Sequence, residues 1–308
     1  MIGNTVAAPI SVVILTKNEA RNLPACLAGV SGWVREIFVV DSGSTDGTVD
    51  IATAAGAHVV AHPFESHARQ WQWALAELPL AGDWVLALDA DQRVSPELRR
   101  SIEQAVVAAS PAGAAPVAFF LNRRQIFRGR WIRHGGYYPK YLLKLFRRGA
   151  ATLDESDRVD HHFRVTGPAW RLDGDLIEDN RNEVRIADWI DKHNRYARLQ
   201  AVEEMARHGA GERRGRLLGN PDERTAWFKN LWARFPLYLR PIGYFVYRYV
   251  IRLGFLDGKE GFVFHFMQAL WYRLLVDINR DEIASATHVA TSPESADHRP
   301  AAARVVDR

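Results

Sequence analysis

Short apolar runs alternate with longer amphipathic stretches between residues 10 and 121. The runs are rich in β-branched residues, as buried strands are, and the stretches between them have the length of helices. Predicted strands are Ile10–Leu15, Glu36–Val40, His58–Ala61, Trp84–Leu88 and Val117–Leu121; predicted helices are Glu19–Gly29, Asp46–Ala55, Ser66–Leu78 and Pro96–Ala109. The alternation favours an α/β fold with a mainly parallel, Rossmann-like sheet.

The remainder of the chain is less regular and divides by composition. A helix is predicted at Asp188–Met205, and residues 207–226 are rich in Gly, Arg and other polar residues. We therefore expect a catalytic-type α/β domain over 1–206, a linker over 207–226, and an aromatic, basic helical region over 227–283. Residues 284–308 are rich in Ala, Ser, Pro and charge, which predicts a disordered tail.

Composition changes this picture little but excludes several classes. Of the 308 residues, 47% are hydrophobic and 25% charged, the values of an ordinary globular protein rather than a fibrous or disordered one. The single cysteine, Cys26, cannot form an internal disulfide, which favours a reducing compartment. We see no secretory signal and no apolar run of about 20 residues that could span a bilayer. A net charge of +4 is too weak a bias to favour a nucleic-acid partner.

Polar clusters follow three of the predicted strands. They are Thr16-Lys17-Asn18-Glu19, the stretch from Asp41 to Thr48, and Asp89-Ala90-Asp91. Each cluster alone has a structural alternative, since Thr16, Asn18 or Asp46 can cap a helix and Asp89 and Asp91 can form a turn. Ligands bind parallel sheets at the carboxyl ends of the strands, so the three clusters together favour a ligand site.

The Asp89-Ala90-Asp91 element carries the most specific chemistry. Residues two apart leave a strand on the same side, and two carboxylates there repel unless a cation lies between them. Mg²⁺ or Mn²⁺ is bound through one or two carboxylates together with substrate phosphates. The chain has no Gly-x-Gly-x-x-Gly after the first strand and no Walker loop, which disfavours dinucleotide redox and P-loop chemistry.

In order along the chain, ILTKNEARNLPACL, VVDSGSTDGTVDIA and WVLALDADQRVSPEL resemble glycosyltransferase family 2. HPFESHARQWQWAL, WIDKHNRYARLQA and GFLDGKEGFVFHFMQALWYRLLVD extend the resemblance to the branch that builds bacterial lipopolysaccharide core and exopolysaccharide. The resemblance implies the GT-A fold and inverting transfer of a sugar from a nucleotide-diphospho-sugar to a lipid-linked or saccharide acceptor, with Mg²⁺ or Mn²⁺. It also implies cell-envelope biosynthesis at the cytoplasmic face of the plasma membrane.

Carried over by position, the resemblance implies a role for most polar residues of the three clusters. Thr16 and Glu19 would contact the nucleoside, Asp41 would hold the base, and Ser42 and Asp46 would support that loop. Asp89 would face the ribose and Asp91 would bind the metal. Arg69 is a candidate for a phosphate contact, or a residue on a solvated helix face.

The general base is expected in the stretch from Asp154 to His162. Related sequences carry a Glu where this chain has His161, within Val159-Asp160-His161-His162. Asp160 is the favoured base, with His161, Glu155 and Asp157 as alternatives, and a solvated polar turn as the structural one. Arg133 and His134-Gly135-Gly136 are candidates for the acceptor pocket.

Residues 227–280 differ from the rest in charge and aromatic content. Eight Lys and Arg stand against three Asp and Glu, a net charge of +5. Pro241 suits a helix start, and Ile242, Phe245, Val246, Tyr249, Val250 and Leu253 fall on one apolar face. A second helix, Gly261–Val276, is apolar nearly all round. This pattern favours helices in a membrane interface with arginines facing anionic lipid; the alternative is a helical cap with snorkelling arginines.

Two other functions remain open at this stage. A nucleotidyltransferase would share the fold and metal but needs a Gly-rich phosphate loop with Lys, which TKNEARN does not supply. A catalytically weakened, membrane-tethered module that binds sugar nucleotides is compatible with the altered Val-Asp-His-His element.

Overall fold

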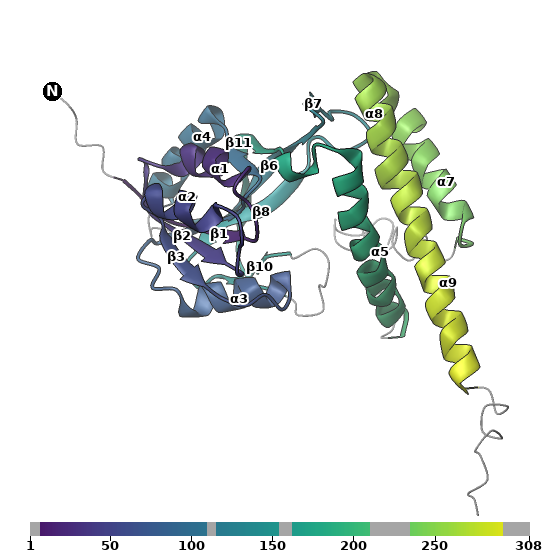
Figure 1. Ribbon diagram of the computed structural model, residues 1–308. Helices are drawn as coiled ribbons and strands as arrows, with labels where there is room; N and C mark the ends of the chain where they lie inside the picture. The colour runs from purple at the N-terminus through teal and green to yellow at the C-terminus, as the bar shows by residue number, and fades with distance from the viewer. Residues whose placement is uncertain (1–6, 110–114, 154–161, 210–234, 292–308) are drawn as a thin grey trace, which may run out of the picture.

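The computed structural model describes residues 7–109, 115–153, 162–209 and 235–291, and centres on a curled, mostly parallel sheet (Figure 1). Within these residues the sheet has nine strands in the order β3-β2-β1-β4-β8-β6-β11-β5, with β7 paired to β6. The strands are β1 Ala8–Thr16, β2 Val34–Asp41, β3 His58–Ala61, β4 Trp84–Asp89, β5 Gln92–Val94, β6 Ala118–Phe127, β7 Arg130–Trp131, β8 Tyr141–Arg147 and β11 Ala169–Glu178. A separate ladder joins β9 Ala151–Thr152 to β10 Arg164–Val165.

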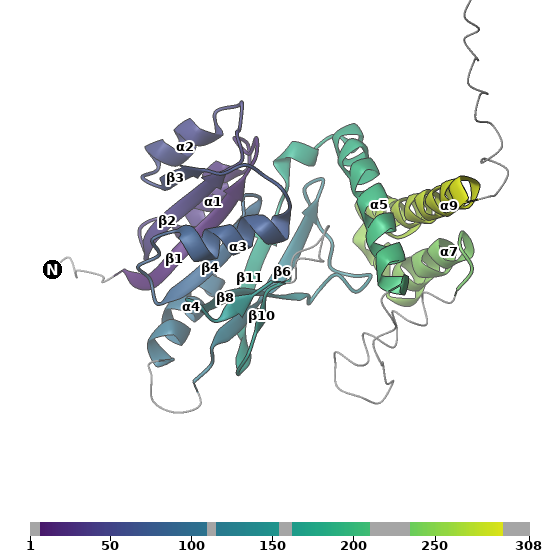
Figure 2. The same cartoon turned by 90° about the horizontal axis from the view of Figure 1, so that it is seen from below.

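The predicted half of the fold is confirmed. β1, β2, β3 and β4 pair in parallel, and helices cover both faces of the sheet. On one face, α1 (Leu23–Val30), α2 (Thr48–Ala54) and α4 (Pro96–Ala108) share a core with the strands. On the other face, α3 (His67–Glu77) buries Trp71 and Ala74. Figure 2 shows α3 crossing the sheet on this side.

The second half of the sheet is mixed in direction and includes strands that the sequence did not predict. β8 runs antiparallel to both β4 and β6, and β11 is parallel to β6 but antiparallel to β5. β11 reads AWRLDGDLIE and exposes much of its length, so it lacks the continuous apolar run of a central strand. Gly174 has a φ of +92° and lies where a Cβ would meet the backbone of Leu98 at 2.3 Å, so this strand requires glycine against α4.

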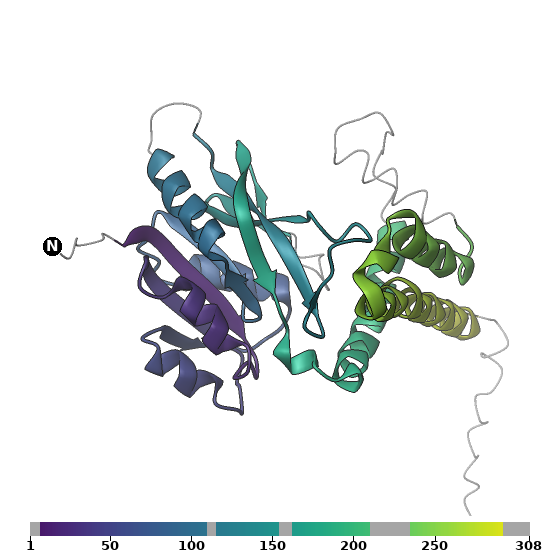
Figure 3. The same ribbon diagram turned by 90° about the horizontal axis from the view of Figure 1, so that it is seen from above.

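A layer of helices stands beside the sheet, with α5 (Ile186–Gly209) nearest to it and α7–α9 on its outer side (Figures 1 and 3). α7 (Leu239–Val246) continues through a π-helical turn, η2 (Tyr247–Ile251), into a short 3₁₀ turn, η3 (Gly254–Asp257). α8 (Gly258–His265), the π-helical turn η4 (Phe266–Trp271) and α9 (Tyr272–Thr291) then follow without a break. Within the part of the chain that the structure describes, no helix combines the length and the hydropathy needed to cross a membrane.

The structure moves two of the predicted domain boundaries. Trp189, Ala197 and Ala201 of α5 share one core with Phe264 and Tyr272, so α5 belongs to the helical layer rather than to the 1–206 domain. It also runs on to Gly209, three residues into the predicted 207–226 linker. The tail prediction for 284–308 is wrong at its start, because α9 continues to Thr291. Ile283 packs on the layer core, and the alanines that follow it favour helix over coil.

Three arginines of this layer, Arg240, Arg273 and Arg280, form ion pairs within it rather than facing anionic lipid as expected. Arg240 is only 3% exposed and forms ion pairs with Asp277 and Glu204. Arg273 and Arg280 also pair with Glu204. Buried charge thus adds to the apolar packing of Tyr272, Val276, Leu275 and Ile283 in holding α9 on the layer.

We expect Arg240→Ala to lower the free energy of unfolding by about 3 kcal/mol, because it leaves the buried carboxylate of Asp277 without its ion pair. Urea denaturation measures this. Arg185→Ala is the matched control: Arg185 is 79% exposed and pairs with Asp188, so its loss should change the free energy of unfolding far less. Equal effects of the two variants would contradict the structural role given to Arg240.

Candidate functional site

Parallel register brings the predicted clusters to one edge of the sheet. Thr16 pairs with Asp41 between β1 and β2, and Leu15 pairs with Asp89 between β1 and β4. The three strands therefore end side by side, and the loops that follow them meet at this edge. The grouping expected from the sequence is correct, and it follows from strand order alone.

Asp41 organises the first of these loops. It is only 3% exposed, and its two carboxylate oxygens accept bonds from Thr16 Oγ1 (3.0 Å), Gly43 N (2.9 Å), Ser44 N (2.8 Å) and Ser44 Oγ. Burial alone would raise the pKa of Asp41, but these hydrogen bonds outweigh it and hold the pKa below its ordinary value. A carboxylate has about four acceptor positions, so a nucleotide base would have to replace one of these bonds.

Other side chains tie the same loop to its neighbours. Asp46 accepts from Ala20 N at 3.2 Å and from Thr48 N at 3.0 Å, which joins the loops after β1 and β2 and caps α2. Ser42 Oγ accepts from Gln70 Nε2 of α3 at 3.2 Å. Asp46 and Ser42 therefore link this loop by hydrogen bonds to the loop after β1 and to α3.

Asp89 is paired with a lysine that the sequence gave no reason to select. Lys144 of β8 is 4% exposed, and its Nζ lies 2.9 Å from Asp89 Oδ2. The antiparallel insertion of β8 beside β4 places this cation under the end of β4. The charge of Asp89 is therefore compensated from within the fold.

Asp91 stands in a different environment, because its nearest charged neighbour is another carboxylate. β11 pairs with β5 so that Glu178 lies opposite Gln92, and Asp179 N donates to Asp91 O at 3.0 Å. Burial, together with the charges of Glu178 and Asp89, raises the pKa of Asp91 well above its ordinary value. Glu178 is the second carboxylate of this edge, and it was missed because β11 was not predicted.

The carboxylates of Asp91 and Glu178 fit a divalent cation with oxygen ligands. No described side chain donates a hydrogen bond to the carboxylate of Asp91, and the described ranges contain no cluster of three or more His, Cys, Asp or Glu that could hold a metal. Mg²⁺ and Mn²⁺ are commonly bound by one or two carboxylates completed by substrate phosphates. Asp91 and Glu178 would supply the protein half of such a site, with Glu178 giving up its ion pair with Arg123 (3.3 Å) or its hydrogen bond from Gln92 Nε2 (3.0 Å).

Glu19 lies within a hydrogen-bonded clasp rather than at an open surface. Its Oε2 accepts from Asn22 Nδ2 at 2.7 Å and from Asn182 Nδ2 at 3.0 Å, and burial raises its pKa. Asn182 belongs to the segment that follows β11. The clasp fastens the loop after β1 to the far side of the sheet.

The clasp continues into α5 through Glu183. Asn180 Nδ2 donates to Glu183 Oε1 at 2.8 Å, and Lys192 Nζ donates to the same oxygen. Burial alone would lower the pKa of Lys192, but Glu183 outweighs burial and raises it, so Lys192 keeps its charge beside the acidic edge. None of these residues carried a sequence signal, since they meet only through the fold.

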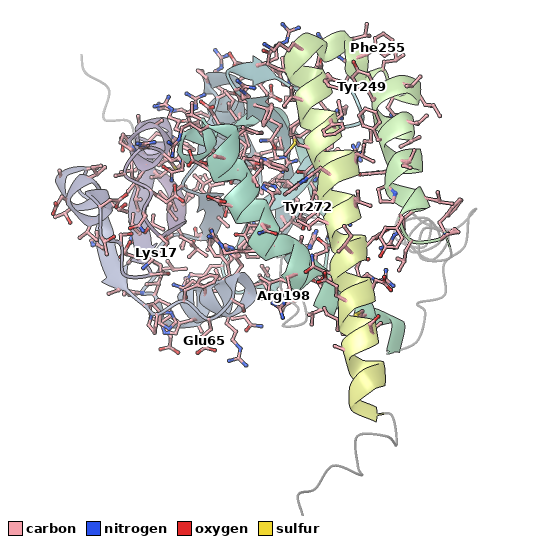
Figure 4. The ribbon with its side chains drawn as sticks, turned by 45° about the vertical axis from the view of Figure 1, so that its right-hand side comes forward. Lys17, Glu65, Arg198, Tyr249, Phe255 and Tyr272 are labelled. Atoms are coloured by element: carbon pink, nitrogen blue, oxygen red, sulfur yellow. The ribbon has the colours of Figure 1, made fainter. Side chains whose placement is uncertain are left out.

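The remaining predicted residues fall elsewhere. Arg69 is exposed on α3 and pairs with Glu65, which precedes that helix. Figure 4 shows Glu65 at the edge of the sheet domain, with Lys17 on the same domain. Asp160, Glu155, Asp157 and His161 lie outside the described residues. His134 donates from its backbone to Asp257 at 2.8 Å and pairs with it through Nδ1 at 2.7 Å, which ties this loop to the helical layer.

Comparison with known proteins assigns the fold to a family. The model of glycosyl transferase family 2 matches residues 11–166, just over half of the chain. The chain belongs to glycosyltransferase family 2, and its sheet is of the GT-A type, as predicted.

The relatives differ in how much of the chain they share. A glycosyltransferase of Rickettsia felis, described as uncharacterized, is 43% identical over 30% of this chain and 32% of its own length, so this chain spans about a third of it. The lipopolysaccharide core biosynthesis glycosyltransferase LpsC of Rhizobium meliloti is 26% identical over 85% of this chain and 90% of its own. Among solved structures, glucosyl-3-phosphoglycerate synthase from Mycobacterium tuberculosis with Mn²⁺ and uridine diphosphate is 28% identical over 39% of this chain and 44% of its own, with a TM-score of 0.29.

We expect Asp41→Asn to destabilise the fold by about 2 kcal/mol, because an amide NH₂ would face backbone donors that now share a carboxylate. Thermal and urea unfolding measure the loss. The lowered pKa means that the carboxylate stabilises the fold above its ordinary pKa of 3.8, and this contribution disappears as the pH falls through the lower folded-state value. The difference from wild type should therefore narrow only at strongly acidic pH. Asp50→Asn, on the exposed side of α2, is the control and should change stability by less than about 0.5 kcal/mol.

Proposed function

We propose that this chain transfers a sugar from a nucleotide-diphospho-sugar to a saccharide or lipid-linked acceptor, with inversion, at the edge where β1, β2 and β4 end. The observation that carries the proposal is the pairing of two carboxylates, Asp91 and Glu178, beside the loop that Asp41 organises. The loop is shaped for a nucleoside, and the carboxylates suit a cation that a diphosphate would complete.

The charges of the site match the charges of the reaction. Displacement at the anomeric carbon leaves a nucleoside diphosphate and gives the sugar ring oxocarbenium character. A metal at Asp91 and Glu178 would supply Lewis-acid stabilisation of the leaving diphosphate. Lys192, held by Glu183, adds a fixed positive charge near this edge, and Asp89, paired with Lys144, would face the ribose.

A single displacement also requires a base on the opposite face of the sugar. Asp160 is our candidate, and Glu155 and Asp157 are the alternatives. Asp160→Asn should lower turnover by at least about 100-fold and leave donor binding within a few fold. Single-turnover transfer and nucleotide titration separate the two effects. If Glu155→Gln or Asp157→Asn alone abolishes turnover, the base is that residue instead.

The acceptor class rests on relatives and on the helical layer. The names of two relatives concern lipopolysaccharide core biosynthesis and transfer to undecaprenyl phosphate, which favours a role in cell-envelope saccharide synthesis. We infer that residues 227–280 hold the enzyme on the cytoplasmic face of the membrane, where lipid-linked acceptors are found.

The alternatives make different demands on the same site. A membrane-tethered binding module would bind nucleotide and metal without turnover, and the departure at His161 is what keeps it open. A nucleotidyltransferase would need a phosphate-binding loop after β1. In this chain the backbone N–H groups of Asn18 and Glu19 in that loop instead donate to the hydroxyls of Ser44 and Thr48, at 2.8 Å each.

We expect Asp91→Asn to reduce transfer by at least about 100-fold and to weaken Mn²⁺ binding in the presence of a nucleoside diphosphate. Glu178→Gln should weaken Mn²⁺ binding as well. Electron paramagnetic resonance of Mn²⁺, with a panel of nucleoside diphosphates, measures binding without turnover. Because the protein supplies only two carboxylates, Mn²⁺ should bind weakly until a diphosphate is added.

The matched control is Asp83→Asn. Asp83 is an exposed carboxylate that precedes the first residue of β4, at the end of that strand away from the site. It should leave Mn²⁺ binding and transfer unchanged. Unchanged Mn²⁺ binding in Asp91→Asn would reject the metal assignment. Nucleotide binding without transfer to any acceptor, across a panel of nucleotide sugars, would favour the binding module.

A further inference from the structure

The helix formed by α7 and η2 has its charged residues inside and its apolar residues outside. Leu239, Ile242, Val246, Val250 and Ile251 are 62%, 52%, 43%, 51% and 65% exposed. Leu239, Ile242, Val246 and Val250 recur every three to four residues, so they form one continuous stripe, which Ile251 adjoins. A soluble amphipathic helix shows the reverse arrangement, with its apolar stripe on the core and its charges in water.

The inner face of this helix explains the reversal. Arg240 is buried in the ion pair with Asp277. Arg248 donates to Gly135 O at 2.7 Å and lies over the ring of Tyr137, 4.5 Å from its centroid. Arg240 and Arg248, two of the basic residues that the sequence suggested for lipid headgroups, are thus engaged within the fold and are not available for an electrostatic attachment.

The outer stripe continues past the helix. Phe255 and Leu256 of η3 are 45% and 51% exposed, and Figure 4 shows Tyr249 and Phe255 at the end of the helical layer away from Lys17. We name this surface, from Leu239 to Leu256, the apolar ridge. Among its described exposed side chains, Arg252 is the one that carries a charge.

We infer that the apolar ridge inserts into the interfacial layer of a lipid bilayer, and that apolar burial rather than attraction to anionic lipid holds it there. Contiguous exposed apolar surface of this kind marks a binding face. An interface with a protein partner usually contains about one hydrogen bond per 100–200 Å², and the apolar ridge has almost no polar groups to form such bonds. Insertion into a bilayer requires no such hydrogen bonds.

The charges around the ridge fit the same occupant. The exposed charged residues at its η3 end are Arg252 and Lys259, whereas Asp257 is buried. Cations at the border of an apolar surface lie at the depth of headgroup phosphates, whatever the net charge of the lipid. Tyr247, 44% exposed, adds an amphipathic ring of the type found at that depth. The inference deepens the membrane attachment in the proposed function, but it requires no sugar transfer.

The test is flotation of the full chain with vesicles of phosphatidylcholine alone and with added phosphatidylglycerol. We expect binding to the neutral vesicles, with less than about a twofold change between about 0.1 M and about 0.5 M NaCl, because apolar burial is not screened by salt. Leu239→Gln with Ile251→Gln should bind at least about tenfold more weakly, since two exposed apolar side chains lose their transfer free energy. Ile242→Gln with Leu256→Gln is a second, independent pair.

Two controls separate the possible causes. Val107→Gln with Val184→Gln removes apolar side chains that are 73% and 61% exposed outside the helical layer and should leave vesicle binding unchanged. Arg252→Gln with Lys259→Gln should change binding to phosphatidylcholine by less than about threefold. Thermal unfolding of each variant, within a few degrees of wild type, shows that the fold is retained.

Several outcomes would overturn the inference. Binding that requires phosphatidylglycerol and disappears in high salt would make the attachment electrostatic. Wild type that does not float with any vesicle, but sediments as a dimer that the Leu239 and Ile251 pair converts to monomer, would make a second copy the occupant. Wild type that neither floats nor self-associates would leave the ridge without a bilayer partner. Loss of sugar transfer in solution, with vesicle binding intact, would instead count against the proposed function alone.

Discussion

The constraint on which this structure depends is the crowding of carboxylates at one edge of a parallel sheet. Strand register brings Asp89 and Asp91 beside Glu178, and like charges at such distances are costly unless they are compensated. Among the described residues, Lys144, which β8 inserts beside β4, pairs with Asp89, and Arg123 of β6 pairs with Glu178. No described cation forms an ion pair with Asp91, whose pKa is raised by burial and by the neighbouring carboxylates. This carboxylate is costly for stability, and it would give the site affinity for a divalent cation.

The loops around this edge are held by hydrogen bonds rather than by apolar packing. Asp41 gathers the backbone donors of its own loop, Asp46 joins two loops, and Asn22 and Asn182 fasten Glu19 to the segment after β11. Asp41, Asp46 and Glu19 are polar and lie in loops that follow a strand, so sequence alone suggests direct ligand contact for them. In the structure several of them instead hold the loops in place, which fixes the shape into which a ligand would fit.

The difference between what sequence predicted and what it missed has a physical origin. β1, β2 and β4 are largely buried on both faces and read as apolar runs. Their shared edge could therefore be predicted, and with it Thr16, Asp41, Asp89 and Asp91. β8 and β11 carry charged and half-exposed residues, so Lys144 and Glu178 could not be found by pattern. Lys192 comes to the site only because α5 packs with α9, a long-range contact that no local signal encodes.

The helical layer shows why net charge is a poor guide to a binding surface. The +5 of residues 227–280 suggested arginines directed at anionic lipid, and the aromatic content suggested an interface. The structure supports only the role of the apolar and aromatic side chains, because Arg240 pairs with Asp277 and Arg248 donates to the backbone of Gly135. Buried arginine needs acidic partners, and Glu204 and Asp277 provide them. Once the charges are internal, apolar side chains are what remains to face outward, so the charge network that stabilises the layer also produces the apolar ridge.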